Sequence, residues 1–118
     1  MLYPLLVLDG ETGQLITVVV RPGTVHAGHG ALAVLQRIVA RLRERWPGVA
    51  ITIRADAGFA KPALFAWCEA EEIAYTIGLV TNPRLLALAA PLAETAQTIS
   101  DHAGGAKVRL IDETSYQA

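Results

Sequence analysis

Cysteine, aromatic residues and long apolar runs are all scarce in this chain of 118 residues. Cys68 is its single cysteine, and 6% of its residues are aromatic. One thiol excludes a framework of internal disulfides and fits a reducing compartment. No run in the sequence reaches the roughly 18 apolar residues that a membrane-spanning helix needs, and the first residues lack the basic region of a signal peptide. We therefore expect an intracellular, cytoplasmic protein with no membrane partner.

Charge is low overall but unevenly distributed along the chain. The net charge of −1 gives no sign of a nucleic-acid partner for the chain as a whole. Residues 1–61 carry seven Lys or Arg and four Asp or Glu, whereas residues 62–118 carry three and seven. What the sequence has in abundance is apolar side chains, at 53%. That fraction and the length fit one domain, 1–118, with a real core.

The first third of the sequence predicts a β-hairpin followed by a helix. Residues 3–23 hold two apolar, β-branched runs on either side of "DGETG", whose glycines suit a tight connection. A loop rich in glycine and proline follows. Residues 31–46 then show helical spacing, and Pro47–Gly48 ends the helix. Its predicted apolar face consists of Ala31, Leu35, Ile38, Leu42 and Trp46.

The remainder of the sequence alternates strands with helices. We expect strands at 49–55 and 74–80 around a helix at 61–73. Asn82 is expected to cap a third helix, which Pro91 should break or kink. Residues 107–118 should add one more extended segment. The predicted order β-β-α-β-α-β-α-β describes an α/β protein with one mixed sheet. Functional sites in such sheets form at the carboxyl ends of the parallel strands.

Asp56 stands at such an end, after the apolar alternation of "ITIRA" and before Gly58. A carboxylate beside a sheet core needs a partner or a metal ion to offset its desolvation. Strand-end acids of this kind hold Mg²⁺ in enzymes that transfer phosphoryl groups. An aspartate also commonly caps a turn. The residues alone leave both interpretations open.

Three other features are weaker candidates for a functional site. His26 and His29 are spaced as H-x-x-H, but they lie in a glycine-rich loop with no third ligand nearby in the sequence. Cys68 is followed closely by three glutamates, which oppose a thiolate, so we expect a buried structural residue. Arginines at four-residue spacing could track a phosphate backbone or simply face solvent. These are Arg37, Arg41 and Arg45.

Four separated blocks of the sequence resemble one family. They are "YPLLVLDGETGQLITVVVRPGTVHAG", "RADAGF", "WCEAEEIAYTIGLVTNPRL" and "SYQA". In this order they are similar to bacterial insertion-sequence transposases of the acidic-triad (DDE) type. The most similar group is the one founded on insertion sequence number 1380.

The resemblance implies an RNase H-like fold and a function in DNA transposition. Such enzymes use Mg²⁺ (or Mn²⁺), held by three acids, to activate water against a DNA phosphodiester. The freed 3′ hydroxyl then attacks target DNA. The "RADAGF" block matches the second acid, so Asp56 would be a catalytic metal ligand. Transposon ends and target DNA would be the partners, with nucleoid association and self-association of the full-length protein. Arg37, Arg41 and His26 would contact DNA.

The same resemblance predicts that 1–118 is an incomplete catalytic domain. The first acid is expected on a central strand before the hairpin, and the final glutamate beyond "SYQA". Glu113 precedes that block and is not assigned. We therefore expect an internal fragment with unpaired sheet edges and no activity of its own. One alternative is a small non-catalytic α/β binding module. Another is a phosphate-accepting, receiver-like domain, which the hairpin after Asp9 disfavours.

Overall fold

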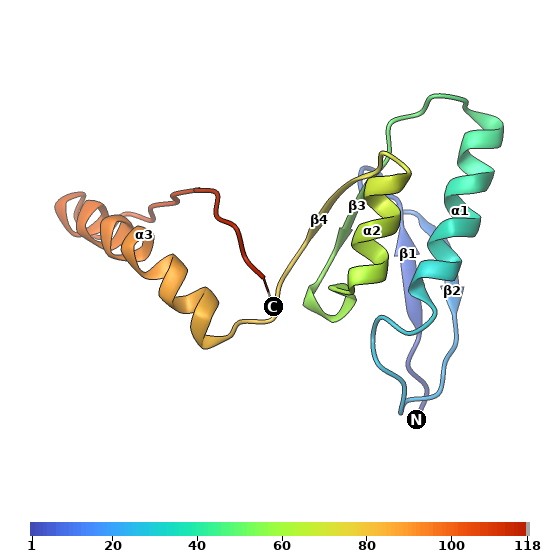
Figure 1. Ribbon diagram of the computed structural model, residues 1–118, viewed down its shortest axis with the longest axis horizontal. Coiled ribbons are helices and arrows are strands. Elements are labelled where there is room, and N and C mark those ends of the chain that lie inside the picture. The colour runs from blue at the N-terminus through green and yellow to red at the C-terminus, as the bar shows by residue number, and fades with distance from the viewer. Residues whose placement is uncertain (118) are drawn as a thin grey trace. The chain divides into compact units, whose positions relative to one another are not determined.

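The computed structural model describes residues 1–117, and the chain divides into two units, Met1–Val80 and Thr81–Ala118. Figure 1 shows the order of the elements. The first unit contains β1 (Leu5–Leu8), β2 (Leu15–Val19), α1 (Ala31–Arg45), β3 (Thr52–Ala55), the short 3₁₀ helix η1 (Ala57–Phe59), α2 (Pro62–Ala70) and β4 (Ala74–Ile77). The second contains α3 (Pro83–His102). Ala118, the last residue of the "SYQA" block, lies outside the described residues.

The predicted hairpin is confirmed. β1 and β2 pair antiparallel, with Leu6 opposite Val18. The turn between them is organised by Asp9, whose carboxylate accepts hydrogen bonds from the Glu11 N–H at 3.0 Å and the Thr12 hydroxyl at 2.8 Å. These bonds, first that from Glu11, hold the pKa of Asp9 below its ordinary value. The Asp9 carboxylate therefore stabilises the turn between β1 and β2.

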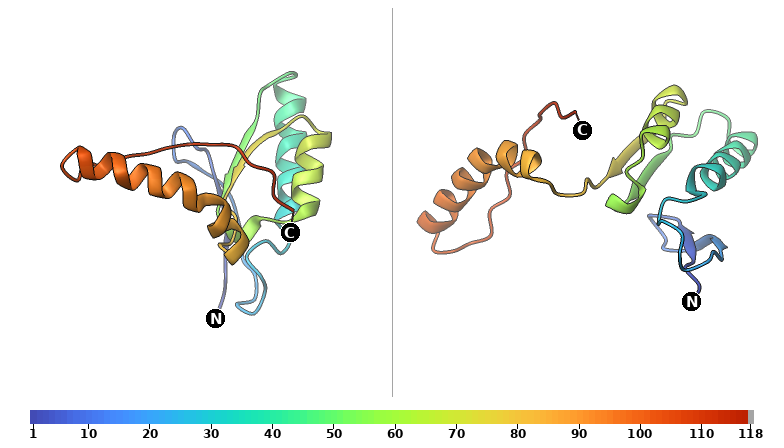
Figure 2. Two further views of the ribbon diagram at one scale, coloured as in Figure 1. Left: turned by 60° about the vertical axis from the view of Figure 1, so that its left-hand side comes forward. Right: turned by 60° about the horizontal axis from the view of Figure 1, so that its bottom comes forward.

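The core of the first unit lies between two helices and a parallel pair of strands. β3 and β4 pair in parallel, with Ala55 opposite Ile77, and α2 forms the crossover between them. α1 and α2 lie side by side next to this pair (Figure 1 and Figure 2). The buried cluster consists of Val39, Leu64, Cys68 and Ile73. Arg43 joins the two helices from outside the cluster through an ion pair with Glu71 at 2.6 Å.

Cys68 is the most deeply buried side chain of the cluster, with no exposed surface. Burial, assisted by the neighbouring Glu69, raises the pKa of its thiol. The expected structural role of Cys68 is therefore confirmed.

The predicted single mixed sheet is wrong. Within residues 1–117 the strands form two separate pairs, β1 with β2 and β3 with β4. The prediction of one antiparallel and one parallel pair of strands is right. The spacing of residues along the sequence does not show whether two such pairs join into one sheet. Side chains on the hairpin therefore stay exposed. They include Leu6, Leu8, Leu15, Val18 and Val20, each between 46% and 61% exposed.

The predicted last strand is also wrong, since residues 106–117 form no regular secondary structure. A strand needs a neighbouring edge to satisfy its backbone groups, and the other element of this unit is a helix. Val108 and Leu110 instead line a small cavity together with residues of α3. Tyr116 is tied to the start of α3, where its hydroxyl accepts a hydrogen bond from the Asn82 amide at 2.7 Å.

α3 differs from expectation at Pro91. Asn82 caps the helix as predicted, since its side chain accepts a hydrogen bond from the Leu85 N–H at 2.9 Å, and Pro83 occupies the first turn. The predicted break at Pro91 is wrong, because the helix continues to His102. Proline removes one backbone hydrogen bond, and Pro91 is exposed, so water can satisfy the freed carbonyl. No helix within residues 1–117 is long and apolar enough to span a membrane.

The predicted apolar face of α1 is partly right. Leu35 packs against the buried cluster as expected. Val39, which the predicted face omitted, is the residue of α1 that belongs to the cluster itself. Trp46 follows the helix as its C-cap and is 57% exposed. The helix thus has a core side and a second apolar side, which includes Ile38 and Leu42 and lines a groove beside β2.

Truncating the core should destabilise the chain far more than truncating the hairpin. Leu64 is 3% exposed and Leu6 is 53% exposed. We expect Leu64→Ala to lower the free energy of unfolding by about 2–5 kcal/mol. The matched variant Leu6→Ala should cost less than about 1 kcal/mol. Urea unfolding followed by circular dichroism measures both, and equal losses would show that Leu64 is not part of a packed core.

The raised pKa of Cys68 predicts a pH dependence of stability. The folded chain holds the thiol proton more tightly than the unfolded chain, because burial disfavours the thiolate. This stabilisation is fully present below the unfolded pKa of about 8.5 and is lost as the pH rises above it. We expect the urea midpoint to fall from about pH 8 to 10, with a smaller slope in Cys68→Ala. Identical slopes in the two proteins would contradict the assignment.

Candidate functional site

Asp56 follows β3 directly, at the carboxyl end of the parallel pair. Its backbone is extended, and it forms the N-cap of η1. The Asp56 carboxylate oxygen Oδ1 accepts a hydrogen bond from the Gly58 N–H at 2.8 Å. The strand therefore delivers this carboxylate to the edge of the sheet where sites of α/β proteins form.

The turn that holds Asp56 leaves its carboxylate accessible. The residue is exposed, and one N–H occupies only part of the acceptor capacity of an ionised carboxylate, which has about four lone-pair sites. Turn capping and cation binding are thus compatible at this position. The two interpretations that the sequence left open do not exclude each other.

Backbone from two other segments closes on this turn. A Cβ atom placed on Gly58 would lie 2.8 Å from the Cβ of Ala27 and 2.9 Å from Oδ1 of Asp56. At the end of β4, a Cβ atom on Gly78 would lie 3.3 Å from the Ala57 nitrogen. The loop after β2 and the end of β4 therefore both pack against residues 56–58, and glycine is required at Gly58 by this close approach.

Arg21 holds the loop that approaches the turn. It is 6% exposed, and its Nη1 donates to the Ala27 carbonyl at 2.7 Å and the His29 carbonyl at 2.6 Å. Sequence reasoning missed this residue, because an arginine next to Pro22 and a glycine looks like ordinary loop polarity. The one available signal was its position at the end of an apolar strand, where a charge must find partners or leave the interior.

The two histidines of the loop do not form a metal site with their neighbours. His26 is exposed, and its Nδ1 accepts a hydrogen bond from the Gly28 N–H at 3.1 Å. His29 contributes its backbone carbonyl to Arg21. Within the part of the chain that the structure describes, no three His, Cys, Asp or Glu side chains gather to hold a metal ion.

Lys61 is a second residue that sequence reasoning missed. It precedes α2, is exposed, and its side-chain stem lies 3.5 Å from a Cβ atom placed on Gly28. The loop that carries His26, the Asp56 turn and the start of α2 are therefore neighbours. The side chains of His26 and Lys61 therefore both lie close to Gly28, which itself approaches the Gly58 carbonyl.

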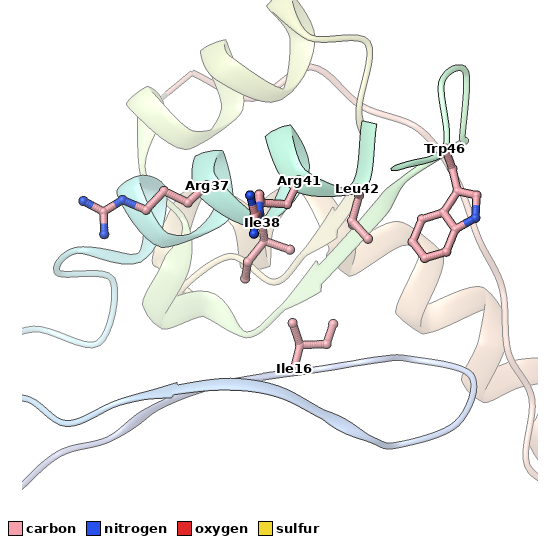
Figure 3. Close-up of a pocket in the computed structure, with 6 residues that line it drawn as sticks. All are labelled: Ile16, Arg37, Ile38, Arg41, Leu42 and Trp46. Carbon is pink, nitrogen blue, oxygen red and sulfur yellow. The ribbon is translucent and has the colours of Figure 1, made fainter. Parts of the chain in front are cut away.

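Arg37 and Arg41 line a different feature, a groove of about 360 Å³ between α1 and the hairpin. Figure 3 shows Ile38 and Leu42 of α1 directed toward Ile16 of β2, with Trp46 beyond them. The same picture shows Arg37 pointing away along the helix. Arg41 lies 3.8 Å from the Glu44 carboxylate in an exposed pair, which is worth little in free energy.

Comparison with known proteins gives one match. The family model described as transposase DDE domain group 1 matches residues 2–118. No curated protein sequence and no solved structure matches the chain. The matched segment includes the Asp56 turn, the loop held by Arg21 and both units of the chain. Because the model spans nearly the whole sequence, this protein belongs to the transposase DDE domain group 1 family.

Proposed function

We propose that this chain belongs to a protein that acts in DNA transposition, that it is inactive by itself, and that Asp56 is one of the catalytic, metal-binding carboxylates of that protein. The observation that carries the proposal is the position of Asp56. Its exposed side chain stands at the carboxyl end of β3, beside the end of β4, and is oriented by the Gly58 N–H at 2.8 Å. Family membership supplies the reaction class, and the position of the carboxylate supplies the candidate residue.

The chemistry of Asp56 fits a hard divalent cation. Mg²⁺ and Mn²⁺ prefer carboxylate oxygens and commonly take one or two from the protein, completing their shell with water and substrate phosphate. When bound, such an ion stabilises the charge on the attacking and leaving oxygens of a phosphodiester. Asp56 would contribute one ligand. Gly58 would keep one carboxylate oxygen in place, which leaves the remaining acceptor positions for the ion.

The order of elements supports an RNase H-like domain of the group founded on insertion sequence number 1380. A hairpin comes first, then a helix, then a parallel pair whose first strand ends at Asp56. In this proposal the hairpin faces further parts of the catalytic assembly. That assignment gives the exposed apolar side chains of the hairpin, such as Leu6 and Val18, a role in a larger core.

DNA is the proposed partner, both as transposon ends and as target, within the cytoplasm and at the nucleoid. His26 and Lys61 are exposed and lie beside Gly28, which approaches the Asp56 turn at the Gly58 carbonyl, so they would contact phosphates of DNA bound at this turn. Arg37 and Arg41 would add contacts farther along α1. Self-association of the transposase during strand transfer is part of the same proposal.

Metal binding at Asp56 can be tested directly by paramagnetic broadening. We expect Mn²⁺ to bind weakly, in about the millimolar range for a site with one carboxylate. It should broaden the amide signals of Ala57 and Gly58 before those of other exposed segments. Asp56→Asn should remove this broadening, because the amide keeps the turn bond but loses the charge.

Asp112→Asn is the matched control for this experiment. Asp112 also accepts a hydrogen bond from a neighbouring backbone N–H, that of Glu113, at 2.8 Å. The control variant should leave the broadening at Gly58 unchanged. Equal broadening of Gly58 in wild type and Asp56→Asn would refute the proposed ligand.

A single carboxylate should not suffice for strand cleavage. Two-metal chemistry needs several ligands that place both ions about 3.5–4 Å apart, and Asp56 supplies one. We expect purified 1–118 to leave supercoiled DNA intact in the presence of Mg²⁺ or Mn²⁺, as judged on agarose gels. Metal-dependent nicking that Asp56→Ala abolishes would contradict this expectation and show a complete site.

A further inference from the structure

Arg21 is the one charged side chain of residues 1–117 that is buried. A guanidinium in the interior costs free energy unless its N–H groups find acceptors. Here Nη1 reaches the carbonyls of Ala27 and His29, and Nε reaches the Tyr3 carbonyl at 3.2 Å. The three acceptors lie on two segments, so Arg21 ties the loop after β2 to the start of the hairpin.

Tyr3 contacts both the backbone and the side chain of Arg21. The Tyr3 N–H donates to the Arg21 carbonyl at 2.8 Å, and the guanidinium lies 5.3 Å from the centre of the Tyr3 ring. Backbone and side chain of Arg21 are thus both held by Tyr3. Nη1 donates only to loop carbonyls, those of Ala27 and His29.

The loop that Arg21 holds touches the turn that carries Asp56. Ala27, whose carbonyl accepts from Arg21, presents its Cβ to the space beside Gly58, 2.8 Å from where a Gly58 Cβ would stand. Its neighbour Gly28 approaches the Gly58 carbonyl, which would lie 3.1 Å from a Cβ atom on Gly28. Gly58 in turn donates to the Asp56 carboxylate. A continuous chain of contacts runs from Arg21 through the loop to Asp56.

We infer that Arg21 is a positioning residue for Asp56, acting through the Ala27–Gly28 segment of the loop. The importance of this role for transposition rests on the proposed function of Asp56, whereas the contact chain itself does not. Loss of the guanidinium frees two loop carbonyls. The loop is then no longer held against Gly58. Because Gly58 can move, its N–H forms a weaker hydrogen bond with the Asp56 carboxylate.

Amide hydrogen exchange at Gly58, followed by NMR on the full chain, tests the inference. In Arg21→Gln we expect hydrogen exchange at the Gly58 amide to be on the order of tenfold faster. This is the effect expected when the hydrogen bond from the Gly58 N–H to the charged Asp56 carboxylate is largely lost. Exchange at Ala74, the first residue of β4, whose N–H donates to the Ile51 carbonyl at 3.1 Å, serves as the internal reference. A merely structural role would accelerate both amides equally. Such uniform acceleration, or none, overturns the inference.

Two control variants distinguish the effect of the Arg21 hydrogen bonds from a general effect of removing a positive charge. Arg45→Gln removes an exposed arginine of α1 and should leave Gly58 unchanged. Arg21→Lys keeps a cation that can reach one or two carbonyls, so it should restore part of the protection at Gly58. No restoration by lysine, together with a change in Arg45→Gln, would point to a general charge effect and contradict the inference.

A second variant keeps the test decisive if Arg21→Gln does not fold. Ala27→Gly retains every hydrogen bond of Arg21 and removes only the Cβ that meets Gly58. We expect it to accelerate exchange at Gly58 selectively, and unchanged exchange would break the contact chain. Mn²⁺ broadening is scored separately. If Gly58 responds to Arg21 but Mn²⁺ does not depend on Asp56, the positioning role stands and the proposed metal ligand fails.

Discussion

The parallel pairing of β3 with β4 fixes where Asp56 stands, and the whole candidate site depends on it. α2 returns the chain along one side of the strands, so both run in the same direction and end at the same edge. At that edge Gly78 approaches the nitrogen of Ala57, immediately after Asp56. The core cluster around Cys68 holds the crossover in place. A slip of this pairing by one residue would turn the strand-end carboxylate to the other face.

The Asp56 turn at the end of β3 is held in position by residues outside the β3–β4 pair. Asp56 is an exposed residue on a turn of three residues, and such a turn has little packing of its own. The loop after β2 supplies what is lacking, because Ala27 and Gly28 meet Gly58 there. Their position depends on a buried cation, Arg21, rather than on apolar contacts. The inferred positioning of Asp56 thus relies on a residue 35 positions earlier in the chain.

The two strand pairs of the first unit give the chain an unusual distribution of apolar surface. The buried cluster of β3, β4 and the helices is small, with Leu64 and Cys68 at its centre. The hairpin keeps most of its apolar side chains exposed, including Leu8 and Val20. Under the proposed function, this apolar surface of the hairpin would face further parts of a catalytic assembly. Two-stranded sheets rarely bury enough surface to stand alone.

The amino-acid sequence by itself determined the local elements and the candidate carboxylate. Turn residues around Asp9, the cap at Asn82 and the apolar alternation before Asp56 act over a few residues, so their outcome was readable from spacing. Tertiary structure decided that the strands form two separate pairs, that residues 106–117 pack along a helix, and that Arg21 is buried. These depend on which distant groups meet. A buried charge or a paired strand is stable only when its hydrogen-bond partners are in contact with it. Those partners are distant in the sequence, so no local pattern identifies them.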